Sequence, residues 1–241
     1  MRYRIFITML FFALMAPALS VKAQAQDANE GIERGNELFF RGQYELAIFE
    51  YRTALSWPGG HEARARFNIG VCEYKLGRPR EAVAEYRAAI KLREGRFPLA
   101  SYALGLALQD LRRYQEAREA FIQAVKSSDG KHAEALFELA LESQRAGDDR
   151  TAFEHYRKAI AQSNDNIPAC HNNLGVILAK AGLYEEAARE FEAAVKRSRG
   201  KFIEASQNLT RLRQMLGGPS PVMIAGLKTV EDAPGNWMKA E

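Results

Sequence analysis

The stretch RPREAVAEYRAAIKL, residues 78–92, decides the fold of this chain, because its pattern of residues occurs four more times. Apolar residues stand at helical spacing in it, between charged residues, which is typical of an amphipathic α-helix. Each copy holds an alanine, then an aromatic residue, then a second alanine at the same spacing. The other copies are QYELAIFEYRTALS (43–56), RYQEAREAFIQAVKS (113–127), DDRTAFEHYRKAIAQ (148–162) and LYEEAAREFEAAVKR (183–197).

The copies keep one interval of 35 residues, which indicates a repeat architecture. The same interval separates the small residues Gly35, Gly70, Gly105, Ala140 and Gly175, which precede the copies. These small residues lie in segments that also have helical spacing, so each unit is predicted to be a pair of helices. The alanine and aromatic columns are Ala47, Ala82, Ala117, Ala152 and Ala187; Tyr51, Tyr86, Phe121, Tyr156 and Phe191; and Ala54, Ala89, Ala124, Ala159 and Ala194.

Turn residues separate the predicted helices. Glycine joins the two helices of a pair in four units, and Arg112 takes this place in the third unit. Pro98 and Pro168 stand where a first helix would begin, a position at which the missing N–H of proline costs no hydrogen bond. A second set of glycines would end the second helices in the left-handed conformation. The joining glycines are Gly42, Gly77, Gly147 and Gly182, and the terminating glycines are Gly60, Gly95, Gly130 and Gly200.

These columns resemble the tetratricopeptide repeat (TPR), whose usual period is 34 residues rather than 35. The resemblance covers residues 28 to about 216 and implies an all-α fold, a right-handed α-solenoid of five helix pairs closed by a capping helix. The TPR array is expected over residues 26–216, with units 28–62, 63–97, 98–132, 133–167 and 168–202 and a capping helix at 203–216. Residues 217–241 are expected to form a flexible tail, in which the apolar segment 222–227 and Trp237 could dock instead.

Residues 1–25 have the features of a secretory signal peptide. A basic start precedes the apolar run Ile5–Leu19, which is shorter than the roughly 20 residues of a membrane-spanning helix. Ala25 ends an A-x-A sequence, and Ala23 is an alternative cleavage point. We therefore expect a periplasmic or secreted bacterial protein, with an uncleaved N-terminal membrane anchor as the alternative.

The net charge of +4 belongs mostly to this leader. Arg2, Arg4 and Lys22 lie within it, and it holds no acidic residue. Without these three residues the 34 basic residues fall to 31, against 30 acidic residues, so the net charge falls to +1. A chain this close to neutrality, without a basic stripe, gives no indication of nucleic-acid binding.

The sequence predicts no catalytic residue, no metal ligand and no cofactor. It contains no phosphate-binding loop, no HExxH sequence and no GxSxG sequence. Cys170 and His171 are adjacent, but adjacent helical residues point about 100° apart and do not face one site. Cys72 lies three units from Cys170, too far for a disulfide bond, and is expected to be a small core residue.

The resemblance implies that the first helices line a concave surface that binds a protein or peptide. Along it the sequence predicts an exposed aromatic and aliphatic strip that gives way to asparagine in the fifth unit; the alternative is that the aromatic residues fill the core. The three columns of this surface are Ile32, Phe67, Tyr102, Phe137 and Asn172; Phe39, Tyr74, Gln109, Gln144 and Ala179; and Asn36, Val71, Leu106, Leu141 and Val176. The candidate binding residues are Asn36, Phe39, Phe67, Asn68, Tyr74, Tyr102, Phe137, Asn172 and Asn173.

Two functions are consistent with these patterns. The first is a non-catalytic periplasmic adaptor that binds a protein partner through the concave surface. The second is a structural subunit of a permanent envelope complex or a homo-oligomer. A clamp for the C-terminal carboxylate of a chaperone is not expected, because the basic positions of such clamps hold Ile32, Leu99 and Ala103. An enzyme is disfavoured because no cluster of titratable residues is visible.

Overall fold

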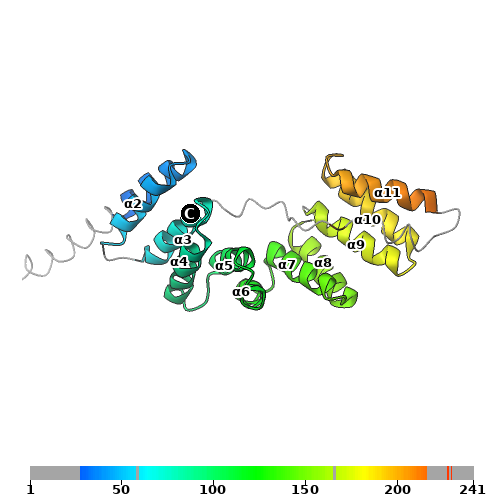
Figure 1. The fold of residues 1–241 in the computed structure, drawn as a ribbon, viewed down its shortest axis with the longest axis horizontal. Helices are drawn as coiled ribbons and strands as arrows, with labels where there is room; N and C mark the ends of the chain where they lie inside the picture. The colour runs from blue at the N-terminus through cyan, green and yellow to red at the C-terminus, as the bar shows by residue number, and fades with distance from the viewer. Residues whose placement is uncertain (1–27, 58–59, 165–166, 216–226, 228, 230–241) are drawn as a thin grey trace, which may run out of the picture. The chain divides into compact units, whose positions relative to one another are not determined.

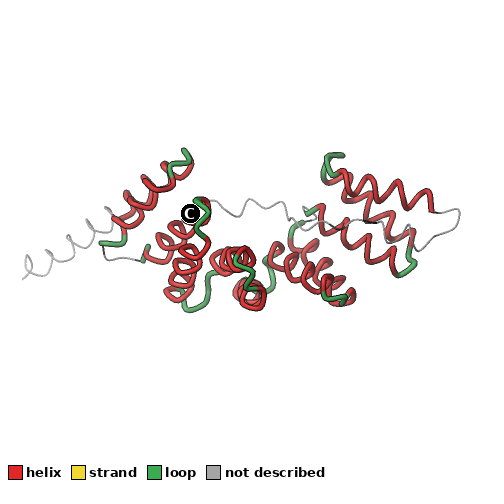
Figure 2. Tube along the Cα trace, viewed as in Figure 1, coloured by secondary structure: helices red, strands yellow, loops and turns green. Residues whose placement is uncertain are grey.

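The computed structural model describes residues 28–57, 60–164, 167–215, 227 and 229, and every regular element in them is an α-helix (Figure 1 and Figure 2). The predicted signal peptide, residues 1–25, lies outside the described residues. In the ranges that the structure describes, no helix has the length and the apolar character needed to cross a membrane.

The helices follow one another in pairs, as the repeat predicts. Residues 28–40 form the first helix. The next helices are α2 (Tyr44–Ala54), α3 (Glu62–Lys75), α4 (Pro79–Leu92), α5 (Pro98–Asp110), α6 (Tyr114–Ser127), α7 (Ala133–Arg145), α8 (Asp149–Gln162), α9 (Pro168–Lys180), α10 (Tyr184–Arg197) and α11 (Ile203–Met215). Pro98 and Pro168 begin α5 and α9, as expected from their missing N–H groups.

The described helices fall into two compact units, with the boundary between Ala117 and Arg118 inside α6. In the first unit α3 packs against α4, and α2 and α5 adjoin this pair. In the second unit α7 packs against α8 and α9 packs against α10, while α8 contacts α9 and α10 contacts α11. The prediction of an all-α solenoid built from helix pairs is therefore confirmed.

The turn residues predicted from the repeat adopt the left-handed backbone conformation at nearly every position. Arg112, the non-glycine member of the joining set, has φ of 58°. The terminating glycines of three units follow another left-handed residue, such as Glu94 before Gly95, so these helices end in two consecutive left-handed residues. The glycines with positive φ are Gly42, Gly77, Gly95, Gly130, Gly147, Gly182 and Gly200.

Gly60 is the exception, and its predicted left-handed conformation is wrong. The second helix of the first pair, α2, ends at Ala54, whereas α4 ends at Leu92, three residues later in the repeat. The sequence places Pro58 in the following segment, and a proline prevents the residues before it from continuing a helix. The helix therefore ends before Gly60 could terminate it.

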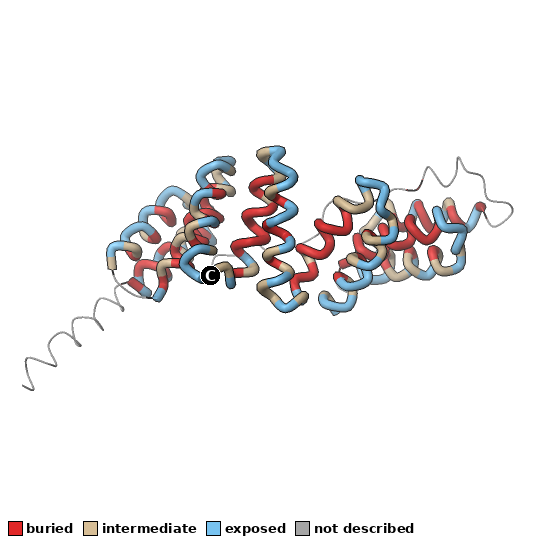
Figure 3. The backbone as a smooth tube through the Cα atoms, turned by 90° about the horizontal axis from the view of Figure 1, so that it is seen from below, coloured by how far each residue is buried: buried red, intermediate tan, exposed pale blue. Residues whose placement is uncertain are grey.

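The core of the first, second and fifth pairs depends on the glycine of the first helix. A Cβ atom added to Gly70 would lie 2.6 Å from Cε1 of Tyr86, and one added to Gly175 would lie 2.8 Å from Cε1 of Phe191. The aromatic ring of the second helix thus occupies the space that a side chain would need. Both rings are fully buried, and Figure 3 shows the buried residues along the sides where the helices meet.

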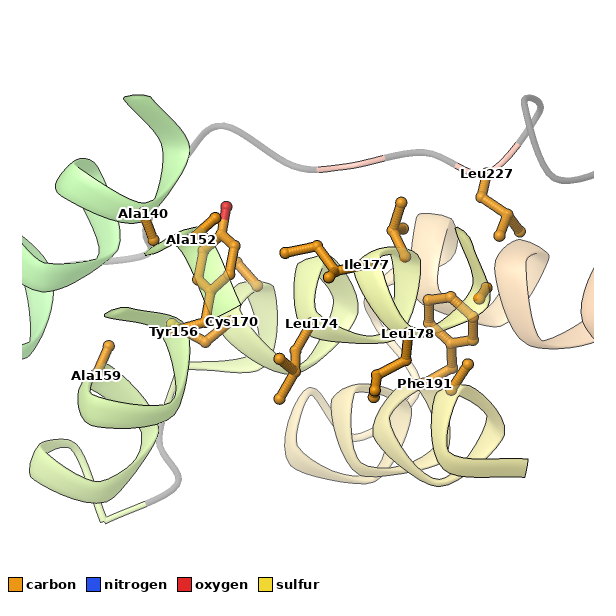
Figure 4. Close-up of a cluster of buried hydrophobic side chains, with 14 of the residues drawn as sticks. Ala140, Ala152, Tyr156, Ala159, Cys170, Leu174, Ile177, Leu178, Phe191 and Leu227 are labelled. Carbon is orange, nitrogen blue, oxygen red and sulfur yellow. The ribbon is translucent and has the colours of Figure 1, made fainter. Parts of the chain in front are cut away.

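In the second unit, the buried apolar residues form one continuous cluster from α7 to α11 (Figure 4). Leu227, from the predicted tail, is 9% exposed and belongs to this cluster, whereas Thr229 is exposed. The other residues of the tail, 217–226, 228 and 230–241, lie outside the described residues. Of the apolar segment 222–227, Leu227 is the residue that the structure describes, and it is docked.

The fit of Tyr86 over Gly70 predicts a specific loss of stability. We expect Gly70→Ala to lower the free energy of unfolding by about 1–3 kcal/mol, because the added methyl group must displace a buried ring. Gly60→Ala is the control, since nothing lies within 4 Å of a Cβ atom added there. Urea unfolding followed by circular dichroism measures both variants, and equal midpoints would contradict this account of the core.

Candidate protein-binding surface

The aromatic residues of the predicted binding strip are buried, so the expected exposure is wrong. Phe67 and Tyr102 are each 1% exposed, and Phe137 is 0% exposed. The ring centroids of Phe67 and Phe97 lie 5.2 Å apart, and the ring centroids of Phe137 and Tyr156 lie 5.9 Å apart. These rings pack against the rings of neighbouring helices, as the alternative interpretation of the sequence held. Phe39 is also buried, beside Phe40 and Tyr44.

The candidate asparagines of the fifth pair, Asn172 and Asn173, are fully buried in a chain of hydrogen bonds. Asn173 Nδ2 donates to Tyr156 Oη at 3.0 Å, and Tyr156 Oη donates to Gln144 Oε1 at 2.9 Å. Asn172 Nδ2 donates to Asn173 Oδ1 at 3.1 Å, and Asn208 Nδ2 donates to Asn172 Oδ1 at 2.9 Å. This amide network, formed by these five residues, joins α7, α8, α9 and α11.

A shorter network of the same kind lies in the first unit. Asn36 Oδ1 accepts hydrogen bonds from Tyr51 Oη at 2.7 Å and from Asn68 Nδ2 at 3.1 Å. Asn68 is fully buried, whereas Asn36 is half-buried. The structure therefore brings together two of the predicted residues, but it uses their amide groups to connect the first helix to α3.

Tyr74 is the second candidate residue that stays partly accessible. Its hydroxyl group donates to Asp110 Oδ2 at 2.5 Å, which links α3 to α5. Burial, and then the neighbouring carboxylate of Asp110, raise the pKa of Tyr74 above its usual range, so the hydroxyl keeps its proton. Leu106 and Gln109, on α5, are half-buried, and Asp110 is exposed.

We define the accessible first-helix set as the residues of the predicted columns in the first unit that remain at least partly exposed, together with Asp110, which binds Tyr74. Leu106 and Gln109 belong to the columns predicted from the repeat, but Asp110 follows them and was missed by the sequence analysis. Asn208 was also missed, although it lies 35 residues after Asn173 and could have been found by that spacing. The accessible first-helix set is Asn36, Tyr74, Leu106, Gln109 and Asp110.

Three of the four histidine side chains form contacts with polar groups of the fold. His171 Nδ1 lies 2.7 Å from Glu190 Oε2, between α9 and α10. His132 Nδ1 accepts a hydrogen bond from the N–H of Ala135 at the start of α7. His61 Nε2 donates to the carbonyl oxygen of Ala54 at 2.8 Å. Within the described ranges, no group of His, Cys, Asp and Glu residues is arranged to hold a metal ion.

Both cysteines are free thiols in the core. Cys72 and Cys170 are each 0% exposed, which confirms the predicted core position of Cys72. Burial raises the pKa of Cys72 to about 12 and raises that of Cys170 as well. Since the thiolate is the reactive form of cysteine, neither side chain is prepared to act as a nucleophile.

The helix pairs, their spacing and their glycine–aromatic contacts can now be compared with known families. The tetratricopeptide repeat family model matches residues 32–97, 102–167 and 144–201, which together make up more than half of the chain. This chain belongs to the tetratricopeptide repeat family. The family predicted from the repeat columns is therefore confirmed, whereas the signal peptide stays a prediction.

Solved TPR structures share this fold. The structure of PilF from Pseudomonas aeruginosa is 20% identical, with a TM-score of 0.64, over 84% of this chain and 97% of that chain. A structure of MamA is 23% identical, with a TM-score of 0.58, over 69% and 95% of the two chains. YrrB, described as a TPR protein with an unusual peptide-binding site, is 20% identical, with a TM-score of 0.57, over 79% and 95%. A comparison with curated protein sequences found no match.

The hydrogen bonding of two buried tyrosines predicts different effects for the same substitution. Tyr156→Phe should lower the free energy of unfolding by about 1–3 kcal/mol, because it removes the hydroxyl group that joins Asn173 to Gln144. Tyr86→Phe should change it by less than about 0.5 kcal/mol or increase it, because the buried hydroxyl of Tyr86 has no hydrogen-bond partner among the described residues. Urea unfolding of the two variants tests this, and an equal loss in both would contradict it.

Proposed function

We propose that this chain is an exported, non-catalytic TPR scaffold that binds a protein or peptide partner in the bacterial envelope. The partner binds the first helices at the accessible first-helix set, and the buried aromatic residues behind it hold these helices in place. The contact that carries the proposal is the hydrogen bond from Tyr74 to Asp110, because it fixes an aromatic ring and a carboxylate from two helices at an accessible position.

The chemistry of this set suits an extended peptide. Gln109 provides an amide group, which can both donate to and accept from a peptide backbone. Tyr74 and Leu106 provide aromatic and aliphatic contact area, and the exposed carboxylate of Asp110 favours a partner with a basic residue nearby. The description of YrrB as a protein with a peptide-binding site supports the same use of the fold in this chain.

A structural role in a permanent complex is the alternative function. It is favoured by three large apolar side chains at the start of the array, Phe40, Leu46 and Phe49, which are more than half exposed. The two functions use different side chains, since the adaptor uses the accessible first-helix set and the structural subunit uses Phe40, Leu46 and Phe49. They can therefore be tested separately.

Photo-crosslinking in the producing cells tests the binding surface. A photoreactive amino acid at Gln109 should form a discrete adduct with a partner, and the adduct should decrease severalfold when Tyr74→Ala is added, since the ring supplies contact area. The control is the same amino acid at Glu94, which is exposed in the turn after α4. Identical adducts from both positions, or adducts that are insensitive to Tyr74→Ala in a folded variant, would contradict the proposed surface.

Export is tested by the N-terminal sequence of the protein isolated from cells. We expect the protein to be released with the periplasmic contents and to begin at Gln26 or Gln24, because signal peptidase cuts after the small residues Ala25 or Ala23. A chain that keeps residues 1–25 and sediments with membranes would show that the segment is an anchor instead.

A further inference from the structure

Met215, the last residue of α11, is buried at a position that the earlier copies of the repeat leave exposed. Its side chain is 2% exposed. The residues that precede it by multiples of 35 are all exposed, including Phe40, which is apolar and 69% exposed. The packing of a helix pair therefore does not by itself cover this position. The equivalent residues are Phe40, Lys75, Asp110, Arg145 and Lys180.

The last helix also has fewer helical neighbours than the earlier first helices. Each earlier first helix is followed by a second helix, as α9 is followed by α10, whereas the described residues contain no helix after α11. Fewer neighbours should leave Met215 more accessible than Lys180, and the structure has the reverse. Something other than a helix of the repeat therefore covers Met215.

Leu227 is the described residue from beyond the helices that joins the same cluster. Leu227, Leu212 and Met215 belong to one group of buried apolar residues, and Leu227 is 9% exposed. In Figure 4 its side chain points toward the helices of the second unit. Thr229, two residues later, is exposed. The chain thus presents Leu227 to the helices and Thr229 to solvent.

The chemistry of the repeat position differs between the two units together with its burial. Asp110, the equivalent of Met215 in the third pair, accepts a hydrogen bond from Tyr74 and belongs to the accessible first-helix set. Methionine is instead a flexible apolar side chain that adapts its shape to another apolar group. A leucine side chain therefore suits Met215, as a basic side chain suits Asp110.

We propose that the C-terminal segment of this chain is an intramolecular ligand of the second unit, held by Leu227 over Met215. It occupies the repeat position that the proposed partner uses at Asp110 in the first unit, so a partner that binds at α11 must displace Leu227. This inference goes beyond the proposed function, because it concerns the other unit and a segment of the chain itself.

The covalent connection makes a weak contact sufficient. Leu227 and α11 belong to one chain and are joined through residues 216–226, so the effective concentration of the segment at α11 is on the order of 1 mM. A segment with a Kd below about 1 mM in the separated form is then bound most of the time. A partner peptide has to compete with this concentration.

Oxidation of methionine in the full-length chain tests whether Leu227 covers Met215. Dilute hydrogen peroxide converts accessible methionine to its sulfoxide, and tandem mass spectrometry gives the rate at Met215. Leu227→Asp should raise this rate about tenfold or more, because a carboxylate is unfavourable against an apolar surface. Thr229→Asp is the matched control, since it adds the same charge at an exposed position and should leave the rate unchanged.

Two outcomes of this experiment would overturn the proposal. The first is an equal rate at Met215 in the two aspartate variants. The second is a loss of helicity in Leu227→Asp, which would show that Leu227 is part of the core rather than a ligand. We expect circular dichroism to show unchanged helicity, because α9, α10 and α11 pack against one another.

A labelled synthetic peptide of residues 220–231 tests whether the segment behaves as a ligand. Fluorescence anisotropy should show binding to the full-length Leu227→Asp chain with a Kd below about 1 mM. Binding to the unchanged chain should be at least about twofold weaker, because its own segment competes. The control peptide, which carries Leu227→Asp, should bind neither chain.

Equal binding of the peptide to both chains, or no binding to Leu227→Asp up to about 1 mM, would overturn the intramolecular ligand. These results are independent of the crosslinks from Gln109, which lies in the first unit. Failure of this inference is therefore distinguishable from failure of the proposed function.

Discussion

The contact between a small residue and an aromatic ring is the constraint on which each helix pair depends. Gly70 and Gly175 leave room for Tyr86 and Phe191, so the first and second helices approach closely. The buried ring of Tyr86 needs an apolar neighbour at its outer edge. Phe67 provides it, and the centroids of the two rings lie 5.9 Å apart. The aromatic residues of the first helices are therefore part of the core.

The close approach of the helices also means that polar side chains between them are buried. A buried amide needs partners, and asparagine can both donate and accept, so buried asparagines connect into networks. Asn173 bonds to Tyr156, and Asn208 attaches α11 to Asn172 of α9. These amide groups stabilise the packing of helices, whereas Tyr74 and Gln109 stay partly accessible.

The periodicity of the sequence was sufficient to predict the helix pairs, the family and the left-handed conformation of Gly95, Gly130 and Gly200, because these depend on residues close in sequence. It could not predict the burial of Phe67 or Asn68. A first helix meets its own pair and the adjoining pairs, so its apolar and polar faces both gain neighbours, and periodicity does not reveal how closely they approach. The left-handed conformation predicted for Gly60 was wrong for a local reason, because α2 ends at Ala54 and the sequence places Pro58 after it.

Differences between copies carry information that a single domain does not offer. A residue type common to all copies is explained by the packing of a pair, because every pair must form the same contacts. Leu46 and Phe49 stand in one copy only, and the other four pairs form without them, so packing within a pair cannot be their purpose. Exposed apolar side chains favour aggregation unless another surface covers them. In this chain such a surface would have to cover Leu46 and Phe49, which are 54% and 66% exposed.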